Sequence, residues 1–179
     1  MQRLAAPLAP ALAWLGARWV ARRRSRHRPS AGPLPAEARP TLAPYFPAPT
    51  LDAARVVVVP RIRQPPLGAL LRRLGLGGAD FDRVLGITFG DTILVVERVR
   101  GPALLSTLFH ELVHVEQARQ LGARAFVRRY VREWIEAGRY GAIPLEREAY
   151  VLQRRYEEAP GQPFDVAAEV ARAPYTGGP

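Results

Sequence analysis

The spacing of hydrophobic positions changes once along the chain, near residue 100. Before that point the apolar runs are short. Residues 54–60 hold four consecutive valines closed by a proline, and residues 84–99 are apolar on both sides of Gly90 and Asp91. The first run predicts a buried strand, and the second predicts two strands joined by a tight turn, in which glycine at the first central position suits a type II′ turn. Together they predict a small antiparallel sheet.

After residue 100 the apolar residues recur every three or four positions, which predicts helices. The first helix is expected over about residues 103–121, because Pro102 suits a first helical position and Gly122 suits a C-terminal cap. Its apolar residues cover most of its circumference, as is typical of a buried helix. Between the strand regions, residues 64–78 predict a turn, one or two helical turns and a glycine-rich stop.

Further helices are expected towards the C-terminus. Residues 123–137 predict an amphipathic helix whose charged side chains, Glu133 among them, face water. Pro144 opens a third helix that runs to about residue 158, and Asp165 can cap a last short one. The chain is therefore expected to be α+β, with a short antiparallel sheet followed by three or four helices.

Residues 1–28 form an apolar and arginine-rich segment. The apolar run over residues 4–20 contains Arg18 and two prolines, so it is shorter than the ~20 residues that a membrane-spanning helix needs. An apolar stripe at helical spacing and a following arginine cluster favour a helix over residues 4–28 that lies on a membrane surface or against a partner helix. The stripe residues are Leu8, Leu12, Leu15 and Trp19. A secretory signal or anchor, and an extension without a role, are the alternatives.

Residues 29–50 are dense in proline. Proline disfavours both helix interiors and central strands, so this stretch predicts a semi-extended linker. We therefore expect the folded domain to begin near Leu51 and to span residues 51–179, with the linker separating it from residues 1–28.

Charge and composition narrow the choice of partners. The formal charge is +10, but residues 1–36 hold seven arginines and no acid, whereas the rest of the chain holds nineteen arginines and sixteen acids. Lysine is absent, which indicates a general composition bias. Because aromatic residues do not alternate with the arginines, sequence-specific nucleic-acid binding is disfavoured. We expect a cytoplasmic protein, peripheral at a membrane, with secretion as the alternative.

The stretch FHELVHVEQ, residues 109–117, holds two of the three histidines in the chain, and the chain has no cysteine. His110 and His114 are four residues apart on a predicted helix, so both imidazoles can bind one Zn²⁺ at ~2.0–2.1 Å. Glu111 lies about 100° round the helix, from where it can act as general base on water at the metal. A metal also offsets the cost of burying these polar groups in an apolar helix.

A catalytic zinc site needs a third protein ligand. The third histidine lies in the arginine cluster, so we expect a carboxylate from the helix that begins at Pro144. Glu146 and Glu148 are about 200° apart on that helix, so only one of them can face the metal. Glu146 shares a face with Ala149 and is the predicted ligand, and Glu148 is the alternative. Candidate donors to a developing oxyanion are Tyr140, Tyr150 and Arg139.

These residues resemble the gluzincin group of zinc metallopeptidases, in which H-E-x-x-H is followed by a helix with the pattern E-x-x-A-[DN]. Here His110–His114 is followed by Glu146-x-x-Ala149. More narrowly, GITFGDTILV followed by LFHELVHVEQARQLG is similar to the metallopeptidase domain found beside extracellular contractile injection systems, the eCIS core domain. The resemblance covers residues 84–150.

The resemblance implies a zincin-like fold, with the active-site helix under a sheet and a strand edge along the substrate groove. It also implies that Glu146 is the third zinc ligand and that Gln117, which matches a glutamine of the family, lies next to the ligands. Tyr150 stands where many gluzincins have the Asp or Asn that orients a ligand histidine.

We therefore expect a zinc-dependent peptidase in which Glu111 is the general base and a protein or peptide is the substrate. The substrate would add as a strand to an exposed edge near Thr92–Val96. The alternative is a non-catalytic, zinc-stabilised binding module that its basic N-terminal arm attaches to a membrane or a partner.

Overall fold

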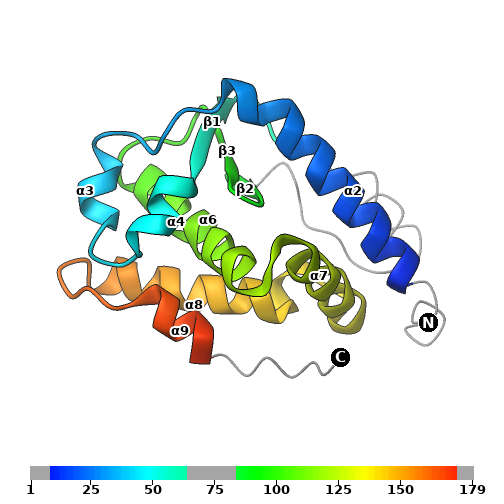
Figure 1. Ribbon diagram of the computed structural model, residues 1–179. Coiled ribbons are helices and arrows are strands. Elements are labelled where there is room, and N and C mark those ends of the chain that lie inside the picture. The colour runs from blue at the N-terminus through cyan, green and yellow to red at the C-terminus, as the bar shows by residue number, and fades with distance from the viewer. Residues whose placement is uncertain (1–8, 64–83, 173–179) are drawn as a thin grey trace.

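The computed structural model describes residues 9–63 and 84–172, and the fold is α+β, as the sequence predicts (Figure 1). The helix expected over residues 64–78 lies outside the described residues. The helices before the sheet are α2 (Ala9–His27), α3 (Ala38–Leu42) and α4 (Ala48–Ala53), with a single 3₁₀ turn, η2 (Arg28–Ser30). The strands are β1 (Arg55–Val59), β2 (Gly86–Phe89) and β3 (Thr92–Val96). They are followed by α6 (Gly101–Leu121), α7 (Ala123–Ala137), the 3₁₀ turn η3 (Tyr140–Ala142), α8 (Pro144–Glu158) and α9 (Val166–Arg172).

The sheet is mixed, with the strand order β1-β3-β2. β2 and β3 form the predicted hairpin, and Gly90 has the positive φ of 70° that a type II′ turn requires at its first central position. β1, however, pairs with β3 in parallel, so the prediction of an antiparallel sheet is wrong for this strand. The long connection between β1 and β2 allows this, because a parallel pair needs a crossover of a dozen or more residues.

The position of each strand corrects two further predictions. β1 is an edge strand whose Val58 is 57% exposed, so it is not the buried strand that its run of valines predicted. β3 is the central strand and is buried at all five residues. The exposed edge expected over Thr92–Val96 therefore does not exist, and the edge beside the site belongs to β2.

α6 runs through the middle of the molecule, with the sheet on one side and α8 and α9 on the other (Figure 1). It is buried from Thr107 to Ala118, as its apolar circumference predicts. The boundaries of α6, α7 and α8 lie within two residues of the predicted ones. Gly122 and Gly138, with φ of 81° and 68°, end α6 and α7.

The prediction of a linker over residues 29–50 is wrong, because this segment builds part of the hydrophobic core. Its larger apolar residues, Leu34, Leu42, Tyr45 and Phe46, are buried, and Tyr45 packs edge-to-face on Phe109 with ring centroids 5.5 Å apart. The short helices α3 and α4 tolerate Pro40 and Pro49 because each proline lies in the first turn, where a backbone N–H has no partner in the helix. The folded part of the chain thus extends well before Leu51.

The helix predicted near the N-terminus is present as α2, and it packs along α7 of the same chain (Figure 1). The predicted stripe is correct at Leu12, which is buried, and at Trp19, which packs on Phe89, and it is wrong at Leu15, which is 49% exposed. Ala13 and Gly16 complete the buried side. Small side chains on the inner side let the two helices approach closely. Leu8 lies outside the described residues. None of the described helices is apolar over a length that would cross a bilayer.

Candidate metal centre

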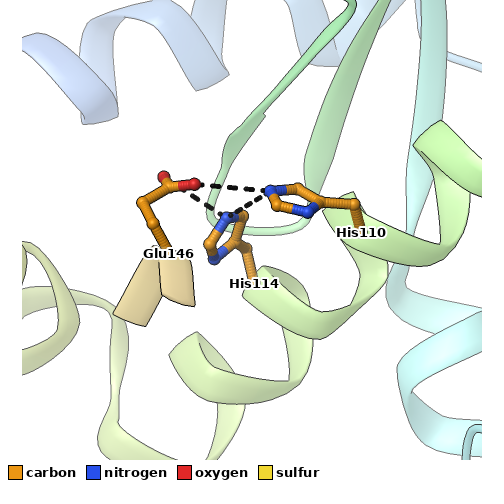
Figure 2. Close-up of side chains that lie close together, drawn as sticks. All are labelled: His110, His114 and Glu146. Atoms are coloured by element: carbon orange, nitrogen blue, oxygen red, sulfur yellow. Dashed lines mark hydrogen bonds and ion pairs between the residues drawn. The ribbon is translucent and has the colours of Figure 1, made fainter. Parts of the chain in front are cut away.

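Two helices bring three potential metal ligands together. His110 and His114 lie on successive turns of α6, and Glu146 lies in the first turn of α8 with its carboxylate directed at both imidazoles (Figure 2). The Nε2 atoms of the histidines are 3.2 Å apart. The Glu146 oxygens are 3.4 Å from His110 Nε2 and 3.5 Å from His114 Nε2. All three side chains are buried.

These separations fit a tetrahedral ion. Ligands at ~2.0–2.1 Å from a tetrahedral Zn²⁺ are separated by about 3.3 Å. The two Nε2 atoms are 3.2 Å apart, and each lies at a similar distance from one oxygen of the Glu146 carboxylate, His110 from Oε2 at 3.4 Å and His114 from Oε1 at 3.5 Å. In addition, Glu146 Oε2 is buried and has no hydrogen-bond partner among the described residues. A buried carboxylate oxygen without a donor is costly unless a cation neutralises it. The imidazole and carboxylate donors are those that zinc accepts in the absence of cysteine.

Two glutamines set the orientation of the imidazoles. His114 Nδ1 lies 2.8 Å from Gln117 Oε1, and His110 Nδ1 lies 2.9 Å from Gln153 Oε1. An amide oxygen only accepts hydrogen bonds, so each Nδ1 holds the proton and each Nε2 presents a lone pair to the centre. The amide orientations follow from their other partners, since Gln117 Nε2 donates to the carbonyl oxygen of Leu145, 3.1 Å away.

The structure brings Glu146, and not Glu148, to the histidines. The Glu148 carboxylate accepts a hydrogen bond of 2.7 Å from Gln117 Nε2 and thereby supports the orientation of His114 from further out. Gln117 contacts His114, where the sequence resemblance placed it. Gln153, which orients the other histidine, was not predicted, because nothing in its spacing from Glu146 marks it as a partner of α6.

Glu133 fixes the start of α8. The sequence placed this residue on the water-facing side of α7, but it is buried, and its Oε2 accepts a hydrogen bond of 3.0 Å from the backbone N–H of Leu145. Arg129 neutralises it through a contact of 2.6 Å. The carboxylate therefore caps the N-terminus of α8 from the neighbouring helix and holds the turn that contains Glu146.

Glu111 projects from α6 towards β2 and is buried. The Thr88 hydroxyl donates to Glu111 Oε2 over 2.7 Å, and Oε1 is the oxygen on the side of Gly86. A Cβ at Gly86 would lie 2.7 Å from that oxygen, so only glycine leaves room for it. Burial raises the pKa of the Glu111 carboxyl, although the nearby histidines oppose this. A carboxylate with a raised pKa is a stronger base than an ordinary one, as a general base requires.

The ligand residues interact strongly with one another. Burial lowers the pKa of His114, but the Glu146 carboxylate outweighs burial and raises it above the ordinary value. Burial raises the pKa of Glu146, and the two histidines outweigh it and hold the pKa well below the usual range. The two shifts have one cause, the attraction between the imidazoles and the Glu146 carboxylate at close range.

A tyrosine that the sequence analysis did not select lies closest to the ligands. The Tyr130 hydroxyl of α7 donates to Glu146 Oε1 over 2.6 Å, and burial raises its pKa, so it stays protonated. Helical spacing had placed Tyr130 on the inner face of α7 but could not show what its hydroxyl meets. Of the selected donors, Tyr140 lines the adjoining cavity, Tyr150 is 43% exposed with its ring 4.5 Å from His110, and Arg139 is exposed.

An apolar cavity of about 120 Å³ adjoins the site. Glu111, His114 and Glu146 line one part of it, and apolar residues of α7, β2 and α2 line the rest.

Comparisons of the chain with protein families, with curated proteins and with solved structures find no match. The gluzincin and eCIS core resemblance therefore remains a prediction.

Proposed function

We propose that this protein is a zinc-dependent peptidase. The observation that supports this best is the buried group of two imidazoles and one carboxylate, whose spacing is close to that of zinc ligands and whose Glu146 Oε2 has no hydrogen-bond donor among the described residues. A general base, an apolar cavity and the edge strand β2 lie next to the site, as cleavage of an extended peptide requires. The substrate class is accordingly a protein or peptide.

The residues divide the work of hydrolysis. His110, His114 and Glu146 would hold the ion, and a bound Zn²⁺ would supply the Lewis acidity that acidifies water and polarises a carbonyl group. Glu111, oriented by Thr88, accepts the proton from the attacking water and later gives it to the nitrogen of the leaving amine. Tyr130 keeps Glu146 in place through its hydrogen bond.

The first experiment is a metal count on the purified protein. We expect about one zinc ion per chain, lost in Glu146→Gln and retained in Glu148→Gln, since only the first carboxylate faces the histidines. Equal zinc content in the two variants would contradict the site described above.

The second experiment tests catalysis on a denatured protein substrate, with peptide release as the readout. Glu111→Gln removes the base while keeping a side chain of the same size, so release should fall by about 10²–10⁴-fold at unchanged zinc content. Chelation should also abolish release. If zinc is bound but Glu111→Gln matches the wild type, the ion serves only to join α6 to α8, as in a zinc-stabilised binding module.

A further inference from the structure

α2 closes the cavity at the site from outside. Gly16, Trp19 and Val20 of this helix line the same cavity as Glu111 and the metal ligands. In Figure 1, α2 lies along the outside of the molecule next to β2 and α7. A helix in this place lies over the side of the site that a substrate would have to approach.

The covered surface is the edge of β2. All four residues of the strand line the cavity. Successive side chains of a strand point to opposite faces, so a cavity that every residue reaches runs along the strand's edge. Among the described residues β2 pairs only with β3, so its other edge has backbone groups to offer to an added strand. This edge starts beside Glu111, which Thr88 of β2 contacts directly.

The cavity suits one class of side chain. Its walls are mostly apolar, and those that stay in place when α2 moves away come from α7 and β2. The space between these walls and α2 is about 120 Å³, which is room for a branched aliphatic side chain. A charged side chain would lose its hydration there without gaining a partner.

Three contacts hold α2 over this surface. Leu12 and Ala13 are buried against α7 near the beginning of the helix. In the middle, the Trp19 ring packs edge-on against Phe89 of β2, with centroids 5.0 Å apart. Near the end, Arg24 binds both oxygens of Asp91, which follows Gly90 in the β2–β3 turn, over 2.8 and 2.6 Å. The last contact is partly exposed, so it can break at a modest cost.

We propose that the β2 edge and the adjoining cavity bind an extended peptide with a branched aliphatic side chain, and that α2 occupies this groove as a built-in competitor. If α2 occupies the groove, the folded chain is held in a low-activity state; this consequence, unlike the peptide binding itself, rests on the proposed peptidase function. Peptide binding requires α2 to move away, so the apparent affinity depends on the fraction of molecules in which the groove is open.

The test compares two variants that loosen α2 with two matched controls. Trp19→Ala removes the contact with Phe89, and Arg24→Ala removes the contact with Asp91 without changing the lining of the cavity. The controls are Trp14→Ala and Arg22→Ala, which alter exposed residues of the same helix. Thermal melting establishes that each variant is folded.

The first measurement is made on metal-free protein and does not depend on catalysis. The probe is a fluorescein-labelled Ala-Ala-Leu-Ala-Ala peptide, followed by anisotropy, with an Asp-for-Leu version as the specificity control. Both loosened variants should bind the leucine peptide about fivefold or more tightly than the wild type, and the controls should match the wild type. Equal affinity in all five proteins, or equal affinity for the two peptides, would overturn the proposal.

Locking α2 tests the same idea in the opposite direction. The chain has no cysteine, so Arg24→Cys combined with Asp91→Cys offers a unique pair for a reducible bifunctional maleimide. Peptide binding should weaken about tenfold or more on crosslinking and recover on reduction. Unchanged binding after complete crosslinking would show that the peptide does not need the space under α2.

The second measurement, hydrolysis by the zinc-loaded variants, separates this inference from the proposed function. Faster hydrolysis in the two loosened variants supports both. Tighter peptide binding in the loosened variants, with no hydrolysis in any protein, rejects the peptidase function and supports the peptide-binding groove under α2. Hydrolysis that is the same in all variants keeps the peptidase function and rejects α2 as its competitor.

Discussion

Two apolar clusters pack against α6 and differ in the pockets that they border. The first borders an open pocket of about 380 Å³ beside Tyr45, Phe46 and Phe164, and the second borders the cavity of about 120 Å³ beside the metal ligands. The aromatic core, on the side of α8 and α9, contains Tyr45, Phe46, Phe109, Tyr156 and Phe164. Phe109 stacks on Tyr156 at 4.6 Å, and the ring of Tyr45 meets three other rings edge-on. The α2–α7 cluster borders the cavity beside the metal ligands. It contains Leu12, Phe126, Val127, Val131 and Trp134.

The two clusters therefore have separate tasks. The aromatic core packs Phe109 of α6 against Tyr156 of α8, so the two helices that supply His110, His114 and Glu146 are held at a fixed separation. The α2–α7 cluster leaves a cavity beside these residues, which α2 covers. For the proposed peptidase this division is useful, because catalysis depends on ligand positions that are set before the substrate arrives.

The largest expected effect compares one phenylalanine from each cluster. Phe109→Ala, in the fully buried aromatic core, should lower the free energy of unfolding by about 3–5 kcal/mol, whereas Phe126→Ala should cost roughly half as much because it already borders a cavity. Urea denaturation measures both. Val151→Ala, at an exposed position of α8, is the control and should stay within about 0.5 kcal/mol of the wild type. Equal losses for the two phenylalanines would remove the distinction between the clusters.

Gly86→Ala should affect the site more than the fold. The new Cβ would lie 2.7 Å from Glu111 Oε1 and 2.8 Å from Thr107 Cγ2, so the Glu111 side chain must shift. We expect peptide hydrolysis to fall by about 10²–10⁴-fold, as for loss of a general base, with zinc content unchanged. Gly32→Ala is the matched control, because a Cβ there meets nothing within 4 Å. Full activity in Gly86→Ala would mean that Glu111 need not occupy its present position.

The two glutamines that orient the histidines should contribute a smaller effect, on metal affinity. Gln117→Leu and Gln153→Leu each remove an acceptor from an imidazole Nδ1, so zinc affinity should fall by roughly 10–100-fold in each. Competition with a zinc-binding dye measures this. Gln162→Leu, at an exposed position far along the chain, should leave the affinity unchanged. Unchanged affinity in both site variants would show that the histidines are oriented by their packing alone.

Local signals account for what the sequence predicted well. Pro102, Gly122 and Gly138 mark helix ends through the backbone itself, so α6, α7 and α8 were predicted within two residues. Helical geometry likewise put His110 and His114 on one face, and the choice of Glu146 over Glu148 used the same spacing. In each case the information lies within about one turn of the chain.

The errors concern contacts between elements that are distant in the sequence. Residues 29–50 have the proline content of a linker, but Pro40 and Pro49 lie in the first turns of short helices, where proline is tolerated. The burial of Tyr45 against Phe109 is a long-range contact, so the local sequence gives no sign of it. Thr88, Tyr130 and Gln153 were missed for the same reason, since each acts through a partner on another helix or strand. Because Glu133 is charged, it was predicted to face water, and the sequence does not show that it accepts a hydrogen bond from the backbone N–H of Leu145.

The smallest expected effect concerns the contact between Arg24 of α2 and Asp91 in the β2–β3 turn. Burial raises the pKa of Asp91, but Arg24 and Thr92 outweigh it through hydrogen bonds, so the pKa is lower in the folded chain than in the unfolded one. Such a group stabilises the fold above its unfolded pKa of about 3.9, and the contribution is lost as the pH falls through the folded pKa.

Asp91→Asn should therefore lower the free energy of unfolding by only about 0.5–1 kcal/mol at pH 7, since Arg24 is partly exposed and screened by solvent. The difference from the wild type should shrink as the pH is lowered from 7 towards 3. Thermal melts at several pH values test this, with Asp52→Asn, whose partner Arg39 is also exposed, as the control at about 0–0.5 kcal/mol. A loss of several kcal/mol at Asp91 would make α2 as firmly held as the aromatic core, and α2 could then not leave the groove at a modest cost.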